Sequence, residues 1–139
     1  MSYDEKGTWA YLVTSAAAYA AYLGIMVGRL QGTPVAQVSY GWVLLWTAIA
    51  SVVASTMART LVETVRPSDS RRSDVRDKEI FRFGEHASRW FIVAGAAAGF
   101  FMALMRWDYF WIANAIYLGF VLWAVAGSAI RLVAYRRGL

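Results

Sequence analysis

The sequence contains no cysteine and a single histidine, His86, among its 139 residues. Without thiols the chain can form neither a disulfide nor a thiolate metal site, and it has no cysteine nucleophile. One histidine leaves little scope for a zinc or haem site within one chain. These absences predict a protein that binds no metal ion and no other cofactor.

Sequence motifs of common enzyme classes are missing as well. The chain has no G-x-S-x-G, H-E-x-x-H, P-loop or dinucleotide-binding pattern. His86 has no obvious serine and acid partners in the sequence. We therefore predict no catalytic residues and no enzymatic activity.

Apolar residues, in contrast, make up 59% of the chain, and they include seven tryptophans. The connections between the first and second and between the third and fourth apolar stretches are short, which forces neighbouring helices to run in opposite directions. The sequence predicts an all-α fold, a bundle of four transmembrane helices with antiparallel neighbours, formed by residues 1–139 as a single integral membrane domain. Each of its spans approaches the roughly 20 residues that a helix needs to cross the hydrocarbon: about 8–28, 39–58, 90–105 and 109–129.

The basic residues predict the orientation of the chain in the membrane. The net charge of +5 does not indicate nucleic-acid binding, because the basic residues are confined to short segments that flank apolar runs. Only Arg29 and Arg106 lie on one side, whereas Lys6, the loop 59–89 and the C-terminal segment carry all the others. By the positive-inside rule, both termini and the loop 59–89 are cytoplasmic, which predicts a multi-pass protein of the plasma (inner) membrane.

Small residues recur along each apolar stretch. They predict close packing between helices, because lipid tails provide no hydrophobic drive for helix association. The pattern does not separate contacts within one chain from contacts in a homodimer, so a homo-oligomer stays an alternative. The clearest stripes are those of the first span, Ala16, Ala20, Gly24 and Gly28, and of the third span, Gly95, Gly99 and Ala103.

Polar residues within the spans form a candidate intramembrane site. Asn114 stands out, since its amide needs partners in hydrocarbon, and an interhelical hydrogen bond satisfies it as well as a substrate does. No charged residue lies at the middle of a span. If the polar groups instead lined a path, the protein would be a small dimeric transporter or channel. The residues concerned are Asn114, Ser51, Ser55, Tyr19 and Tyr22.

The charged stretch "SDVRDKEIFRFGEHASRW", residues 73–90, precedes the third span. Ser73 or Asp74 can cap a helix that continues without a break into that span. At 100° per residue, two faces result. The apolar face contains Ile80, Phe83, Ala87, Trp90 and Phe91, and the charged face, which we expect to be solvated, contains Asp74, Lys78, Arg82, Glu85 and Arg89.

Two charged residues do not fit the solvated face. Arg76 and Asp77 project near the apolar face, where the extended end of the second span approaches. We expect Arg76 or Asp77 to form an ion pair with Glu63 or Arg59 and so to join the extensions of the second and third spans.

Residues 74–85, "DVRDKEIFRFGE", carry one family resemblance. They resemble a D-E-R-D-x-x-I-x-x-R-G-E pattern that precedes a membrane span in small bacterial membrane proteins of unknown function. Val75 and Phe83 depart from that pattern. The resemblance implies a multi-span bacterial membrane protein with a charged cytoplasmic helix and implies no activity. The corresponding positions are Asp74, Arg76, Asp77, Ile80, Gly84 and Glu85.

These observations favour a small accessory, regulatory or interaction protein of the membrane. Its basic cytoplasmic surface would bind a protein partner or anionic lipid. The transporter or channel described above is the alternative. The residues predicted for the basic surface are Arg71, Arg72, Lys78, Arg82, Arg136 and Arg137.

Overall fold

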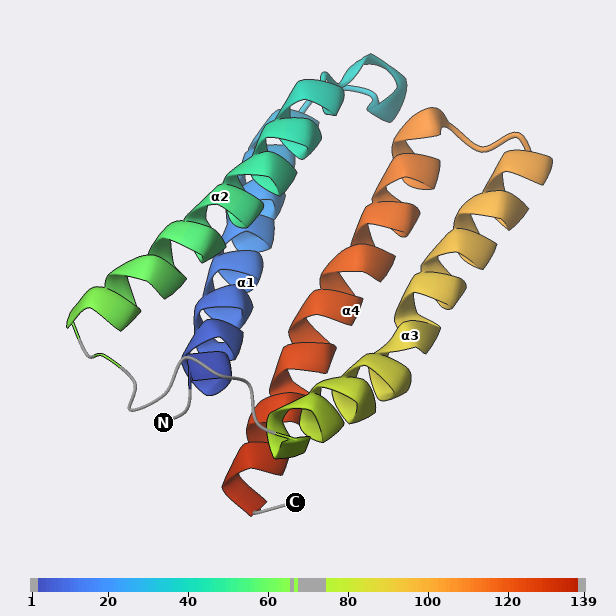
Figure 1. Cartoon of the computed structure of the whole chain (residues 1–139). Coiled ribbons are helices and arrows are strands. Elements are labelled where there is room, and N and C mark those ends of the chain that lie inside the picture. Colours follow the sequence, from blue (N-terminus) through green and yellow to red (C-terminus); the bar gives the residue numbers. More distant parts are fainter. Residues whose placement is uncertain (1–2, 66, 68–74, 138–139) are drawn as a thin grey trace.

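The computed structural model describes residues 3–65, 67 and 75–137, and these residues form an all-α fold without strands (Figure 1). Each of the four long helices is long and apolar enough to cross a membrane. The predicted all-α class, with four helices long and apolar enough to span a membrane, is therefore confirmed. The elements are α1 (Tyr3–Leu30), the short 3-10 helix η1 (Val35–Gln37), α2 (Gly41–Val65), α3 (Val75–Leu104) and α4 (Tyr109–Arg137).

The helices extend beyond the predicted apolar stretches. Because α2 continues to Val65 and α3 begins at Val75, most of the predicted loop 59–89 is helical. The charged stretch and the third apolar run form one continuous helix, as predicted. The proposed capping residues, Ser73 and Asp74, lie outside the described residues.

The two described connections end their helices by different means. After α1, Gly32 adopts a φ of 86°, a left-handed conformation that glycine adopts without steric cost, and Pro34 follows it. After α3, Arg106 takes the left-handed position, with a φ of 56°. The Trp107 N–H donates to the Met102 carbonyl and the Arg106 N–H to the Ala103 carbonyl, at 2.9 and 3.1 Å. This is a Schellman motif with arginine in the position that glycine usually occupies.

The helices pack as two pairs, α1 with α2 and α3 with α4, joined by contacts between α1 and α4 (Figure 1). α1 and α4 are therefore the inner helices, with α2 packed on α1 and α3 packed on α4. The start of α1 and the end of α4 lie at the same end of the bundle, which we call the terminal end, and the connections after α1 and α3 lie at the opposite end, the loop end (Figure 1). The N and C labels in the figure mark the terminal end.

The closest helix contact joins α3 to α4 through glycines. A Cβ added at Gly95 would lie 2.7 Å from the Gly119 Cα, and one added at Gly99 would lie 2.7 Å from the Ile116 Cγ1. Gly84 and Gly127 make similarly close approaches to side chains of the facing helix. Because glycine has no side chain, the two backbones can approach closely at these positions. Close approach is how helices gain van der Waals contact in a membrane.

Gly24 and Gly28 of α1 behave differently from the glycines of α3. A Cβ at Gly24 or Gly28 would meet no atom within 4 Å, and Ala16 and Ala20 are exposed. At this level α1 instead contributes Tyr22 and Met26 to a buried cluster with Val38 and Phe110. The small-residue stripe of α1 therefore faces away from the chain's own helices.

The contrast between these glycines gives a stability prediction. Gly95→Val should lower the free energy of unfolding by about 1–3 kcal/mol, since the new side chain overpacks the α3–α4 contact. Gly24→Val makes the same chemical change at an open helical position and is the matched control, with little loss expected. Unfolding of the purified protein in mixed detergent micelles, followed by circular dichroism, measures both. Equal losses in the two variants would contradict the assigned contact.

Candidate functional site

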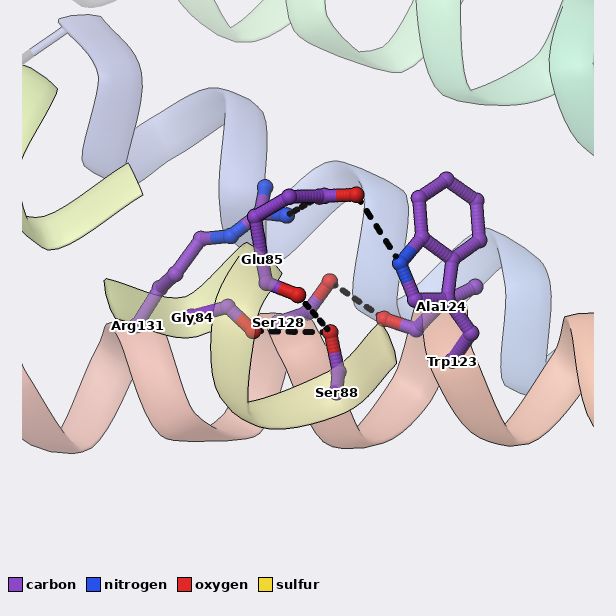
Figure 2. A network of polar contacts seen from close by, with 7 residues as sticks. All are labelled: Gly84, Glu85, Ser88, Trp123, Ala124, Ser128 and Arg131. Carbon is purple, nitrogen blue, oxygen red and sulfur yellow. Dashed lines mark hydrogen bonds and ion pairs between the residues drawn. The ribbon is translucent and has the colours of Figure 1, made fainter. Parts of the chain in front are cut away.

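Arg131 of α4 lies against α3 at the terminal end, in what we call the Arg131 cluster: Phe81, Gly84, Glu85, Trp123 and Arg131. Figure 2 shows these residues except Phe81. The guanidinium Nη2 donates to Glu85 Oε2 at 3.2 Å, and Trp123 Nε1 donates to Glu85 Oε1 at 3.2 Å. The guanidinium carbon is also 4.3 Å from the centroid of the Phe81 ring, a cation–π geometry. One carboxylate thus receives donors from two positions of α4.

Gly84 makes room for this arrangement. A Cβ there would lie 2.5 Å from the Arg131 Cγ and 2.9 Å from its Nε. One turn further along α3, Ser88 is fully buried and donates to the Gly84 carbonyl at 2.7 Å (Figure 2). Ser128 of α4 donates to its own helix in the same way, at the Ala124 carbonyl. The serine hydroxyls are satisfied within their helices, so they act as small residues at the contact.

Arg59 of α2 forms a comparable group with α1, the Arg59 cluster: Tyr3, Asp4, Gly7 and Arg59. Its Nη2 donates to Asp4 Oδ1 at 3.1 Å, and its guanidinium carbon lies 4.1 Å from the centroid of the Tyr3 ring. A Cβ at Gly7 would lie 2.9 Å from the Arg59 Nε. Beside this cluster, Lys6 and Glu63 form an ion pair at 3.5 Å with both side chains more than nine-tenths buried.

The two clusters share one plan. In each, an arginine from the second helix of a pair lies against a glycine of the first helix, pairs with a carboxylate and covers an aromatic ring of that same helix. The sequence carries a trace of this plan, because "VASTMAR" (53–59) and "VAGSAIR" (125–131) match at three positions, including the arginine. This match could have pointed to the two arginines, but not to the glycines, carboxylates and rings that they contact on α1 and α3.

Both arginines line a cavity at the terminal end, which we call the four-helix cavity. Its volume is about 680 Å³, and all four helices contribute to its wall. Arg59, Lys78, Arg82 and Arg131 supply positive charge, and Asp4 and Asp77 supply negative charge. Hydroxyl groups complete the lining: Tyr3, Thr8, Tyr11, Ser55, Thr56, Thr60 and Tyr135.

The structure places the four residues predicted to join α2 and α3 as follows. Glu63 pairs with Lys6 and Arg59 with Asp4, so both contact α1. Arg76 donates to the Tyr135 carbonyl of α4 at 3.5 Å, and Asp77 lines the four-helix cavity together with Arg59. An ion pair between the α2 and α3 extensions stays a prediction.

The residues predicted for the basic surface are divided among different environments. Arg71 and Arg72 lie outside the described residues. Lys78 and Arg82 line the four-helix cavity, Arg136 lies 5.7 Å from the centroid of the Trp9 ring, and Arg137 is exposed.

The expected solvated face of α3 needs one correction, at Glu85. This side chain lies against α4, where it contacts Arg131 and Trp123. Helical periodicity placed Glu85 on one face of the helix with Lys78 and Arg82, but it could not show that an arginine and a tryptophan of α4 face its carboxylate. The predicted apolar face also differs. Ile80 is buried, together with Gly84 and Ser88, but the other four members of that face are exposed: Phe83, Ala87, Trp90 and Phe91.

Most of the predicted intramembrane polar residues contact one another. Tyr22 is fully buried and donates to Asn114 Oδ1 at 2.7 Å, and the Asn114 amide donates to the Phe110 carbonyl. Tyr19 packs edge-on against Tyr117, 5.6 Å between centroids, and Ser51 donates to Ser15 at 3.5 Å. These contacts join α1 to α2 and α4. Ser55 belongs elsewhere, since it lines the four-helix cavity.

Comparison with known proteins adds no assignment. No family model, curated protein or solved structure matches the chain. The resemblance of residues 74–85 stays a prediction. Within the described residues, no three histidine or acidic side chains gather in a way that could hold a metal ion.

The Arg131 cluster gives the second prediction. Glu85→Gln keeps the side-chain shape but removes the charge that pairs with Arg131, which is 13% exposed. The free energy of unfolding should fall by about 1.5–3 kcal/mol, the range for a hydrogen bond to a charged group. Glu79→Gln, at an exposed position of the same helix, is the control and should change it by less than about 0.5 kcal/mol.

A double-mutant cycle with Arg131→Met tests the pairing directly. If the two residues stabilise the fold as a pair, the double variant should lose less than the sum of the single variants. Additive losses would show that they act independently.

Proposed function

We propose that the protein is a small integral membrane protein with antiparallel neighbouring helices and with both termini in the cytoplasm. The order of the helix contacts supports the antiparallel arrangement. Gly84, early in α3, meets Arg131, late in α4, whereas Gly99, later in α3, meets Ile116, earlier in α4. The distribution of basic residues supports the orientation, because the terminal end carries most of them.

The proposed role is that of an accessory or regulatory protein whose basic cytoplasmic end binds an acidic protein partner. One observation carries this proposal: basic residues of α3 and α4 gather at the terminal end. Arg136 of α4 reaches Trp9 of α1, and Arg76 of α3 reaches the Tyr135 carbonyl of α4. Since Lys78 and Arg82 line the four-helix cavity, we assign the partner surface to Arg136 and Arg137 among the described residues.

The absence of cysteine makes the orientation directly measurable. Single variants Thr64→Cys, at the terminal end, and Gln31→Cys, at the loop end, introduce one thiol each into a chain that has none. In intact cells, a membrane-impermeant maleimide should label only the Gln31→Cys variant, and permeabilised cells should label both. Labelling of Thr64→Cys in intact cells would contradict the proposed orientation.

Photo-crosslinking tests the partner surface. A photoreactive residue at Arg137 should give a discrete protein adduct in native membranes, and one at Arg106, the matched arginine at the loop end, should not. The adduct should weaken with added salt, because exposed charges are screened over about 10 Å at 0.1 M ionic strength. Adducts of the same mass from both positions, or none from Arg137, would contradict the proposed surface.

A further inference from the structure

The four-helix cavity lies between helices that do not belong to one packed pair. Its wall includes Arg59 of α2 and Lys78, Phe81 and Arg82 of α3, and its remaining wall comes from α1 and α4. Because α2 packs on α1 and α3 packs on α4, the cavity occupies the space between the two outer helices. At about 680 Å³, it is within the size range of small-molecule sites in proteins.

The charge of the lining favours an anion. Four basic side chains and two carboxylates give a formal charge of +2, that is 4 − 2. Asp4 already pairs with Arg59, and Arg131 pairs with Glu85. Within the described part of the chain, no ion pair or hydrogen bond engages the side chains of Lys78 and Arg82, which leaves two cations at the cavity for a ligand.

Apolar faces continue from the cavity toward the loop end. On α2, Val52 and Leu45 lie seven and fourteen residues before Arg59, on the same face, and both are exposed. On α3, Val93 and Phe100 lie eleven and eighteen residues after Arg82, and both are exposed. Fourteen helical residues span roughly 21 Å. These faces are therefore longer than the ~15 Å depth of one hydrocarbon leaflet.

We propose that the four-helix cavity binds the phosphate headgroup of an anionic phospholipid, whose acyl chains lie along the exposed apolar faces of α2 and α3. Lys78 and Arg82 contact the phosphate, and the phenol hydroxyls of Tyr3 and Tyr11, which also line the cavity, donate to its oxygens. The two unpaired cations favour an anionic over a zwitterionic lipid. This site rests on the membrane placement proposed above and does not depend on the protein partner.

Native mass spectrometry of the purified full-length chain tests the site. Phosphatidylglycerol and phosphatidylcholine with the same acyl chains are added separately, and the lipid-bound fraction is measured. Phosphatidylglycerol should bind more tightly. Lys78→Gln and Arg82→Gln should each weaken its binding by about fivefold, as expected for one basic residue near an anionic headgroup. Equal binding of both lipids by the unmodified chain would overturn the proposal.

A matched double variant separates a site from general attraction. Arg136→Gln/Arg137→Gln makes the same charge change at the terminal end as Lys78→Gln/Arg82→Gln, but outside the cavity. It should keep phosphatidylglycerol binding. Equal weakening by the two double variants would show diffuse electrostatic attraction and overturn the site. If position 137 gives no protein adduct but phosphatidylglycerol binds as expected, only the partner proposal fails. If the adduct forms but both lipids bind equally, only the lipid site fails.

Two further measurements distinguish a lipid from a soluble anion. Inorganic phosphate at millimolar concentration should not displace phosphatidylglycerol. A phosphatidylglycerol with a diazirine on its acyl chain should form adducts on α2 and α3, near Val52 and Val93, rather than near Ala20 of α1. Complete displacement by phosphate, or adducts spread equally over all four helices, would overturn the assignment to a lipid.

Discussion

The fold depends on how arginines are accommodated where helices meet. A guanidinium between two helices needs acceptors for its N–H groups and space for its planar head, and leaving it unpaired costs free energy. Glycine provides the space at Gly7 and Gly84, and the same helix provides the carboxylate, Asp4 or Glu85. Without these glycines, Arg59 and Arg131 could not lie against the neighbouring backbone.

The two helix pairs use this solution at the terminal end and differ elsewhere. Along α3 and α4, glycines continue the close approach as far as Gly99. Along α1, the corresponding region carries Tyr19 and Tyr22, whose rings and hydroxyls fill the space toward Tyr117 and Asn114. The α3–α4 pair is therefore held by backbone proximity along its length. The contact between the inner helices α1 and α4 is held by aromatic packing and one interhelical hydrogen bond.

The sequence predicted the helices well because length, hydropathy and helical periodicity are local properties. It predicted that Gly95 and Gly99 lie at a helix contact, since small residues at a regular spacing have few other uses in a span. The same spacing marked Gly24 and Gly28 without showing whether they meet a helix of the same chain, and in the structure they do not. The partners of Glu85 and Arg59 could not be predicted, since they depend on the relative rotation of two helices and on side-chain reach. Helical periodicity placed Lys78 and Arg82 on the charged face of α3 but could not show that this face borders a cavity.

Each arginine cluster lies within a single helix pair, and this has a mechanical consequence. At the loop end, a cluster that includes Tyr22, Met26, Val38 and Phe110 joins the two pairs, and Thr47 of α2 is within hydrogen-bond distance, 3.3 Å, of the Tyr117 hydroxyl of α4. At the terminal end, the cavity separates α2 from α3. A rotation of one pair against the other about the loop end would change the width of the cavity mouth. It would leave both salt bridges intact, because each of them lies within one pair.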